Sequence, residues 1–191
     1  MIAAMQDAAY SILRKAESYE WSLQGFGMLR CYLGASRRVR LHVWDDRYAV
    51  PNVSLIHDHP WAFESTILSG TVRNVRFYEH SSGRPTHHAQ VILCGPGGCA
   101  LERLADVRLS VRDDCTYRAP DDYGQDATWL HASYPSRGAV TVIERHFGRG
   151  DTERARVLFP VGTSWVSAEP RLATPGEVAD ICGHALAVWG K

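Results

Sequence analysis

Hydrophobic residues alternate with polar ones in short runs over most of the chain, a pattern typical of β-strands. Glycine, proline, asparagine and aspartate residues separate these runs, for example at Pro51-Asn52 and in the sequence GPGG at 95–98. The expected strands cover residues 28–33, 38–44, 53–57, 63–68, 71–78, 89–94, 100–104, 107–111, 115–118, 128–133 and 139–146. So many short strands with turns between them predict an all-β fold, an antiparallel sandwich or barrel.

The hydrophobic period changes from that of a strand to that of a helix at both ends of the chain. Apolar residues recur at helical spacing over residues 3–17, with charged residues between them. Near the other end, Thr174, Pro175 and Glu177 have the arrangement of a capping box with proline at the first helical position. The apolar stripe that follows predicts a second helix over residues 175–189, packed on the barrel or on a partner subunit.

The length and charge of the chain narrow its class. The 191 residues fit a single domain, with the barrel expected over roughly residues 28–160. The 21 basic and 21 acidic residues cancel, and no basic run is longer than Arg37-Arg38, so nucleic-acid binding is not indicated. No apolar run approaches the roughly 18 residues of a membrane span, and Asp7 and Arg14 interrupt any export signal.

The cysteines indicate a reducing compartment. The chain has five of them, an odd number, scattered and without a CxxC pair. We therefore expect reduced thiols, mostly buried, in a cytoplasmic protein.

The stretch SLIHDHPWAFESTILSG, residues 54–70, carries the candidate chemistry. Alternate residues of a strand point to the same side, so His57 and His59 can present both imidazoles to one point in space. Glu64 and Gly70 follow on the next strand. Paired imidazoles of this kind indicate a metal site, although a chance His-x-His pair in a surface loop would look the same.

This stretch resembles the first motif of the cupin superfamily. In that motif His-x-His, a glutamate after three or four residues and a later glycine lie on two adjacent strands of a small barrel. Here the intervals are His57-x-His59, four residues, Glu64, five residues and Gly70, the last interval being one residue short. The resemblance implies an antiparallel double-stranded β-helix, or jelly-roll, barrel with helices at both ends.

The second cupin motif is matched only in part. Its best candidate is His131, in YRAPDDYGQDATWLHASYP. Asp126 and Thr128 stand where the family has proline and glycine, and Pro135 stands where it has asparagine. The resemblance implies that His57, His59 and His131 bind the metal, with Glu64 as a possible fourth ligand and catalytic group.

A site of three neutral imidazoles, with or without a carboxylate, suits a divalent transition metal. We expect Fe(II), with Mn, Ni or Zn as alternatives. The resemblance then implies a non-haem iron oxygenase that uses O2 on a small polar molecule such as an amino acid or related acid. The alternatives are a cupin isomerase, lyase or hydrolase in which the metal acts as a Lewis acid, and a ligand-binding cupin without catalysis.

SLIHDH also looks like the strand leading into the ligands of cysteine dioxygenase-type enzymes, which use three histidines and no glutamate. Some of those enzymes have a cysteine where this chain has Glu64, and no cysteine lies between His57 and Gly70. Glu64 is therefore the diagnostic residue between the two kinds of cupin site. Cupins in general also suggest a homodimer.

Several residues are candidates for binding or transforming the substrate. Arg40, His42 and Trp44 share one face of a strand; the simpler interpretation turns this polar face to solvent, and the alternative turns it into the barrel. A guanidinium inside a barrel would hold a carboxylate in a bidentate manner. Trp129, two residues before His131, is expected on the same face as that histidine. The full set of candidates is Arg30, Arg40, Arg73 and Trp129 for substrate binding and Tyr117 as a proton donor.

Overall fold

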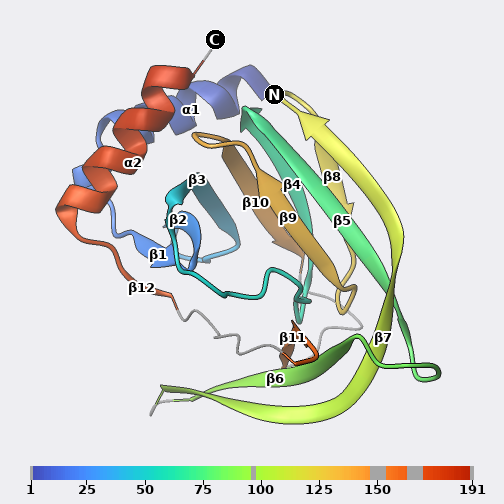
Figure 1. The fold of residues 1–191 in the computed structure, drawn as a ribbon. Coiled ribbons are helices and arrows are strands. Elements are labelled where there is room, and N and C mark those ends of the chain that lie inside the picture. Colours follow the sequence, from blue (N-terminus) through green and yellow to red (C-terminus); the bar gives the residue numbers. More distant parts are fainter. Residues whose placement is uncertain (1, 96–97, 147–153, 163–169, 190–191) are drawn as a thin grey trace.

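The computed structural model describes residues 2–95, 98–146, 154–162 and 170–189. Within these ranges the chain forms two helices, one short 3-10 helix and strands that pair antiparallel (Figure 1). In chain order the elements are α1 (Ile2–Arg14), η1 (Ala16–Ser18), β1 (Ser22–Gln24), β2 (Phe26–Leu33), β3 (Val39–Ala49), β4 (Ala62–Ser69), β5 (Thr71–His80), β6 (His87–Gly95), β7 (Gly98–Arg118), β8 (Asp122–Gln125), β9 (His131–Pro135), β10 (Val140–His146), β11 (Ala155–Pro160), β12 (Arg171–Leu172) and α2 (Pro175–Val188).

The strands form two sheets. One has seven strands in the order β12-β1-β2-β3-β10-β4-β8, and the other has five in the order β11-β6-β7-β5-β9. β7 bends along its length, so that the five-stranded sheet curls round the lower part of the molecule in Figure 1. The chain passes from one sheet to the other at Gly70, where φ is +77° and an added Cβ would lie 2.7 Å from the Ser136 Oγ. The glycine of the sequence motif is thus required by a tight turn.

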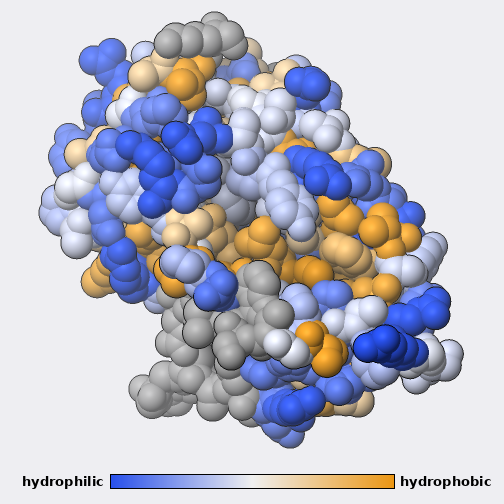
Figure 2. All heavy atoms as spheres, in the orientation of Figure 1, coloured by the Kyte–Doolittle hydropathy of each residue, from blue (hydrophilic) through white to orange (hydrophobic). Residues whose placement is uncertain are grey.

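The helices cover the outer face of the seven-stranded sheet. α1 and α2 lie side by side, and Tyr10 meets Trp189 edge to face at 5.8 Å. Beneath them Leu41 and Val43 of β3 are fully buried together with Ile181 of α2. Figure 2 shows further hydrophobic side chains in the middle of the visible face, between the helices and the five-stranded sheet. Because the helices take one face of the large sheet, its other face is free to line an interior space.

The predicted all-β, antiparallel class with a helix at each end is confirmed, and the second helix begins at its capping box as expected. Three details of the prediction are wrong. Residues 53–57 form isolated bridges instead of a strand, residues 98–118 form one long strand instead of three, and β9 begins at 131 instead of 128. Thr128 has φ of +66°, which interrupts an extended backbone before β9.

Two further expectations concern the cysteines and the membrane. Cys31 and Cys182 are buried as expected, whereas Cys115 is exposed on β7. The positions of Cys94 and Cys99 side chains lie outside the described residues. Over the described ranges, neither helix has the length and apolar character needed to cross a membrane.

Candidate metal centre

Three histidines predicted from the sequence come together in the structure. The ring nitrogens that His57, His59 and His131 can offer to a metal all lie within 4.8 Å of one another. The Nε2 atoms of His59 and His131 are 3.1 Å apart. Two nitrogens bound at about 2.1 Å to one ion, at a right angle, would be separated by about 3.0 Å. The cluster therefore has the dimensions of a metal site, and among the described residues no other such group occurs.

The backbone of the segment between β3 and β4 fixes the first two histidines. The His57 N–H donates to the His131 carbonyl at 3.0 Å, and the His131 N–H donates back to His57 at 2.9 Å. On its other side the same segment is bonded to β11, because the Leu158 N–H donates to Ile56 and the Asp58 N–H to Arg156. His57 thus lies between the two edge strands of the five-stranded sheet, β9 and β11.

Hydrogen bonds to the far side of two of the three rings select their tautomers. The His57 Nδ1–H donates to the Leu55 carbonyl at 2.9 Å, and the His131 Nδ1–H donates to the Asn74 Oδ1 at 2.8 Å. In a neutral imidazole the other nitrogen, Nε2, then carries the free lone pair. Supporting partners of this kind are typical of metal-binding histidines. The donor set and its supports fit a divalent transition metal.

Burial keeps the three rings neutral. It lowers the pKa of His57 and holds the pKa of His59 and His131 well below the ordinary value; for the latter two, neighbouring imidazoles add to the effect. Aromatic rings complete the enclosure: Phe26 stacks on His57 at 5.5 Å, and Trp61 lies 4.6 Å from His59. Neutral imidazoles can bind a metal without first losing a proton.

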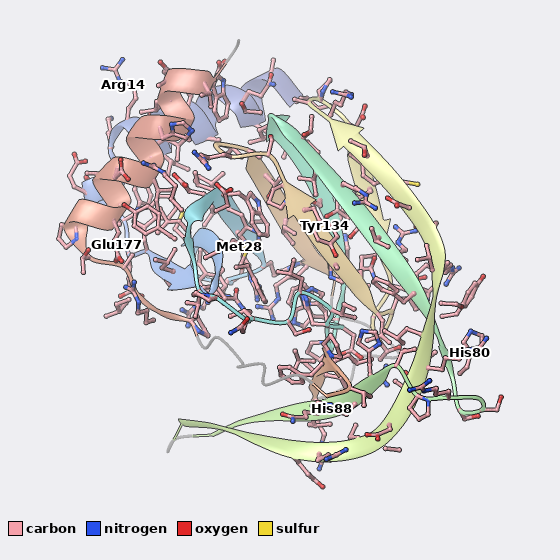
Figure 3. All side chains as sticks on the ribbon, in the orientation of Figure 1. Arg14, Met28, His80, His88, Tyr134 and Glu177 are labelled. Atoms are coloured by element: carbon pink, nitrogen blue, oxygen red, sulfur yellow. The ribbon has the colours of Figure 1, made fainter. Side chains whose placement is uncertain are left out.

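The cluster lies on the wall of a cavity of about 520 Å³ between the two sheets. Met28, labelled in Figure 3, reaches this cavity from β2. A larger hollow of about 670 Å³ lies between α1, η1 and α2, but no metal-binding group of described residues lies there. We therefore take the cavity beside the histidines as the candidate site.

Arg40 and His42 line this cavity, so the simpler interpretation of their strand, with its polar face turned to solvent, is wrong. Only 8% of Arg40 and 4% of His42 are exposed. The physical reason is that α1 and α2 bury Leu41 and Val43 on the opposite face, which leaves the polar face toward the interior. Burial lowers the pKa of Arg40 to about 9, although its guanidinium lies over the rings of Tyr32 and Trp61 at 5.1 and 4.7 Å.

Arg30 also lines the cavity. Its Nε donates to the Ser22 Oγ at 3.2 Å, and burial lowers its pKa. Arg30 on β2 pairs in register with His42 on β3, and Tyr32 pairs with Arg40. Arg30 and Arg40 therefore lie on neighbouring strands, two residues apart in register, on the inner face of the seven-stranded sheet.

Glu64 does not join the histidines, which corrects its assignment as a ligand and catalytic group. Phe63, Ser65 and Ile67 are the buried face of β4, and Glu64 points the other way with 67% of its side chain exposed. Its carboxylate lies 3.7 Å from the His146 Nε2. A period-2 strand cannot present both sets inward, and the aromatic packing of Phe63 decides which set it is.

Three other candidates do not line the cavity and are likewise corrected. Arg73 is exposed and forms an ion pair with Asp114 at 2.6 Å on the outside of the five-stranded sheet. The Trp129 ring lies 3.7 Å from the Arg112 guanidinium, because the turn before β9 breaks the alternation that would have aligned it with His131. Tyr117 stacks on Tyr123 at 4.6 Å, and Tyr123 is the residue that faces the cavity.

Sequence reasoning missed the residues that support the site. Asn74 orients His131, and Tyr123 shares hydrogen bonds with Ser65 and Ser133, while burial raises the Tyr123 pKa. Asp58, between the two motif histidines, is 2% exposed and meets the Arg156 Nε at 2.7 Å. The sequence shows the aspartate between the two histidines but not its burial, and it carries no signal for the role of Asn74.

Comparison with known proteins gives no further guide to identity. No protein-family model matches the chain, and no curated protein is significantly similar to it.

Proposed function

We propose that this protein is a metal-dependent oxygenase with a three-histidine Fe(II) site in a cupin-type jelly-roll domain that spans residues 1–191. The observation that carries the proposal is the convergence of His57, His59 and His131 on one wall of a cavity between the two sheets. The sequence resemblance to cupins supports the same assignment of ligands. The outward position of Glu64 favours the branch of that resemblance that uses three histidines and no glutamate.

The three imidazoles would hold the metal through Nε2, since Leu55 and Asn74 occupy the Nδ1 side of two of the rings. A bound Fe(II) ion would supply open positions for O2 and substrate. The rest of the chain binds and orients the substrate. Trp61, Phe63 and Phe26 exclude water from the rings, and Arg30 and Arg40 supply positive charge for the carboxylate of a small organic acid.

The metal assignment is tested by purifying the protein without oxygen, loading it with Fe(II) or Zn(II), and measuring the bound metal. We expect one ion per chain, lost when His57, His59 or His131 is changed to Ala while the fold is retained. His80→Ala is the matched control, because His80 lies far along β5 and its Nε2 contacts the Ser110 Oγ at 2.7 Å. Equal metal content in all four variants would contradict the assignment.

The oxygenase assignment is tested separately by measuring O2 consumption of the iron-loaded protein with a panel of organic acids, amino acids and thiols. Substrate-dependent O2 uptake by the iron form supports it. Tight zinc binding with no uptake for any compound would instead favour Lewis-acid chemistry by the same three histidines. Sedimentation of the same sample tests the homodimer that we propose for the assembly.

A further inference from the structure

Positively charged side chains outnumber negatively charged ones on the described part of the cavity wall. Among the described residues its cations are Arg30, Arg40 and Arg156, and its one carboxylate is Asp58. That carboxylate is already occupied, since its Oδ1 accepts from the Arg156 backbone N–H at 2.6 Å and its Oδ2 from the Arg156 Nε at 2.7 Å. Arg30 and Arg40 therefore face the cavity with no carboxylate of the described wall to compensate them.

Polar atoms at this end of the cavity also lack partners within the described residues. The Arg40 Nε and both ring nitrogens of His42 are buried and make no hydrogen bond. Buried polar groups in proteins nearly always have a partner, so these atoms indicate a ligand that supplies acceptors to the Arg40 Nε–H and to the one N–H of the neutral His42 ring. The two residues belong to one strand face, two positions apart, and can contact the same small group.

Much of the remaining cavity wall is apolar. Met28, Trp44, Trp61, Phe63 and Ile143 all line it. The volume of about 520 Å³ lies within the roughly 300–1,000 Å³ of pockets that enclose drug-sized molecules. A two- or three-carbon acid would leave most of this apolar surface without contact.

We propose that the ligand of this cavity is an organic anion with an aromatic or similarly apolar body and without an ammonium group. An amino acid would bring an ammonium into a space where Arg30 and Arg40 are already positive and the carboxylate of Asp58 is already paired. Burying an unpaired cation beside other cations is unfavourable. The inference rests on the proposed function in one respect: it places the substrate in the same cavity as the histidines. It narrows the expected substrates from amino acids and related acids to organic acids with an apolar body and no ammonium group.

Four probes that differ by one feature at a time test the inference. These are 3-phenylpropionate, phenylalanine (which adds the ammonium), 3-phenylpropanamide (which removes the charge) and propionate (which removes the ring). Calorimetry or quenching of Trp44 and Trp61 fluorescence gives each dissociation constant. We expect 3-phenylpropionate to bind at least tenfold more tightly than each of the other three. Equal or tighter binding of phenylalanine, of the amide or of propionate, or no binding of any probe, would overturn the inference.

Variants show whether the binding uses the predicted wall. Arg40→Gln and Arg30→Gln should each weaken the binding of 3-phenylpropionate at least tenfold. Arg73→Gln should leave this affinity unchanged, because Arg73 pairs with Asp114 on the outer surface. Unchanged affinity in both cavity variants would contradict the assignment. If Arg40→Gln fails to fold, Arg30→Gln and the probe series on the unaltered protein still decide the question.

The binding measurement is made without oxygen on the metal-free protein and on the zinc-loaded protein. The metal-free arm gives the same ranking of probes whether or not the chain is an oxygenase. If the probes bind in the expected order but no compound causes O2 uptake, only the proposed function is contradicted. If O2 uptake is normal but the probes bind in another order, only this inference is contradicted.

Discussion

Asn74 does for His131 what the Leu55 carbonyl does for His57: each accepts a hydrogen bond from Nδ1 and so turns Nε2 toward the cluster. Asn74 is 1% exposed and sits on β5, next to β9 in the sheet. A side chain placed so deeply, with its oxygen on a ring of the candidate metal centre, acts by positioning that ring.

We expect Asn74→Ala to lower metal affinity about 10- to 100-fold, the range seen when supporting partners of metal ligands are removed. Competition with a chelator of known affinity measures the loss. Asn74→Asp keeps an acceptor at the same place and should restore affinity to within a few-fold. If both variants lose the metal equally, Asn74 has only a structural role.

The sequence identified the three candidate metal ligands but not which strand faces point into the cavity. The spacing of His57 and His59 and the family resemblance of His131 identified the three rings, because side-chain identity and strand period carry that information. Glu64 and Phe63 illustrate the limit: alternation shows that they face opposite ways, but not which one is inside. That depends on what packs against the sheet, and the same ambiguity led to the wrong face for Arg40.

Among the secondary-structure elements, the segment between β3 and β4 was predicted as a strand over residues 53–57. It is held in place mainly by its contacts with β9 and β11. Asp58 contributes most directly, since both its oxygens contact Arg156 of β11, and Arg156 also meets Glu79 at 2.7 Å. Burial raises the pKa of Asp58. Burial would lower the pKa of Arg156, but its contacts with Asp58 and Glu79 have the larger combined effect and raise that pKa. The short contacts of both oxygens indicate a charged pair at neutral pH.

Changing the two partners of this one arginine gives a matched pair of variants. Asp58→Asn should lower the free energy of unfolding by about 3 kcal/mol, because it breaks a pair in which one member is fully buried. Glu79→Gln should cost less than about 1 kcal/mol, since the Glu79 side chain is 36% exposed. Urea unfolding measures both. Equal effects of the two changes would show that burial of Asp58 does not set its contribution.

Elements that begin at a local sequence motif were predictable, whereas short strands that form only by pairing with another strand were not. The capping box at Thr174 fixed the start of α2, because its hydrogen bonds lie within four residues. β8 and β12 are short strands that exist only through pairing with β4 and β1, and nothing in their own sequences distinguished them.

Over the whole molecule, burial lowers the pKa values of four histidines, of which His42 and His131 are buried and His57 and His59 are half-buried. In the unfolded chain these imidazoles titrate near 6.5, while in the folded chain they stay neutral to lower pH. Below pH 6.5 the unfolded state therefore binds more protons, and stability falls as pH falls. The loss from each such histidine approaches about 1.4 kcal/mol per pH unit well below pH 6.5, where its imidazole is fully protonated in the unfolded chain but still neutral in the folded one.

The metal-free protein should accordingly lose more than about 1 kcal/mol of unfolding free energy between pH 6.5 and pH 5.5, the amount that one imidazole with a strongly lowered pKa would give alone. Urea unfolding at the two values measures the loss. His80→Ala should show the same slope, because no imidazole of the cluster is altered. A slope near zero in the unaltered protein would mean that the four rings become protonated without unfolding.

The position of His57 between β9 and β11 has a consequence for the behaviour of the chain in solution. Exposed strand edges are templates for pairing with other chains, and the segment around His57 occupies the facing edges of these two strands. Anything that releases the segment, including loss of the Asp58 pair, would uncover both edges at once. The residues that would hold a metal would then also protect the protein from aggregation, and variants of this segment should aggregate more readily on heating than the unaltered protein.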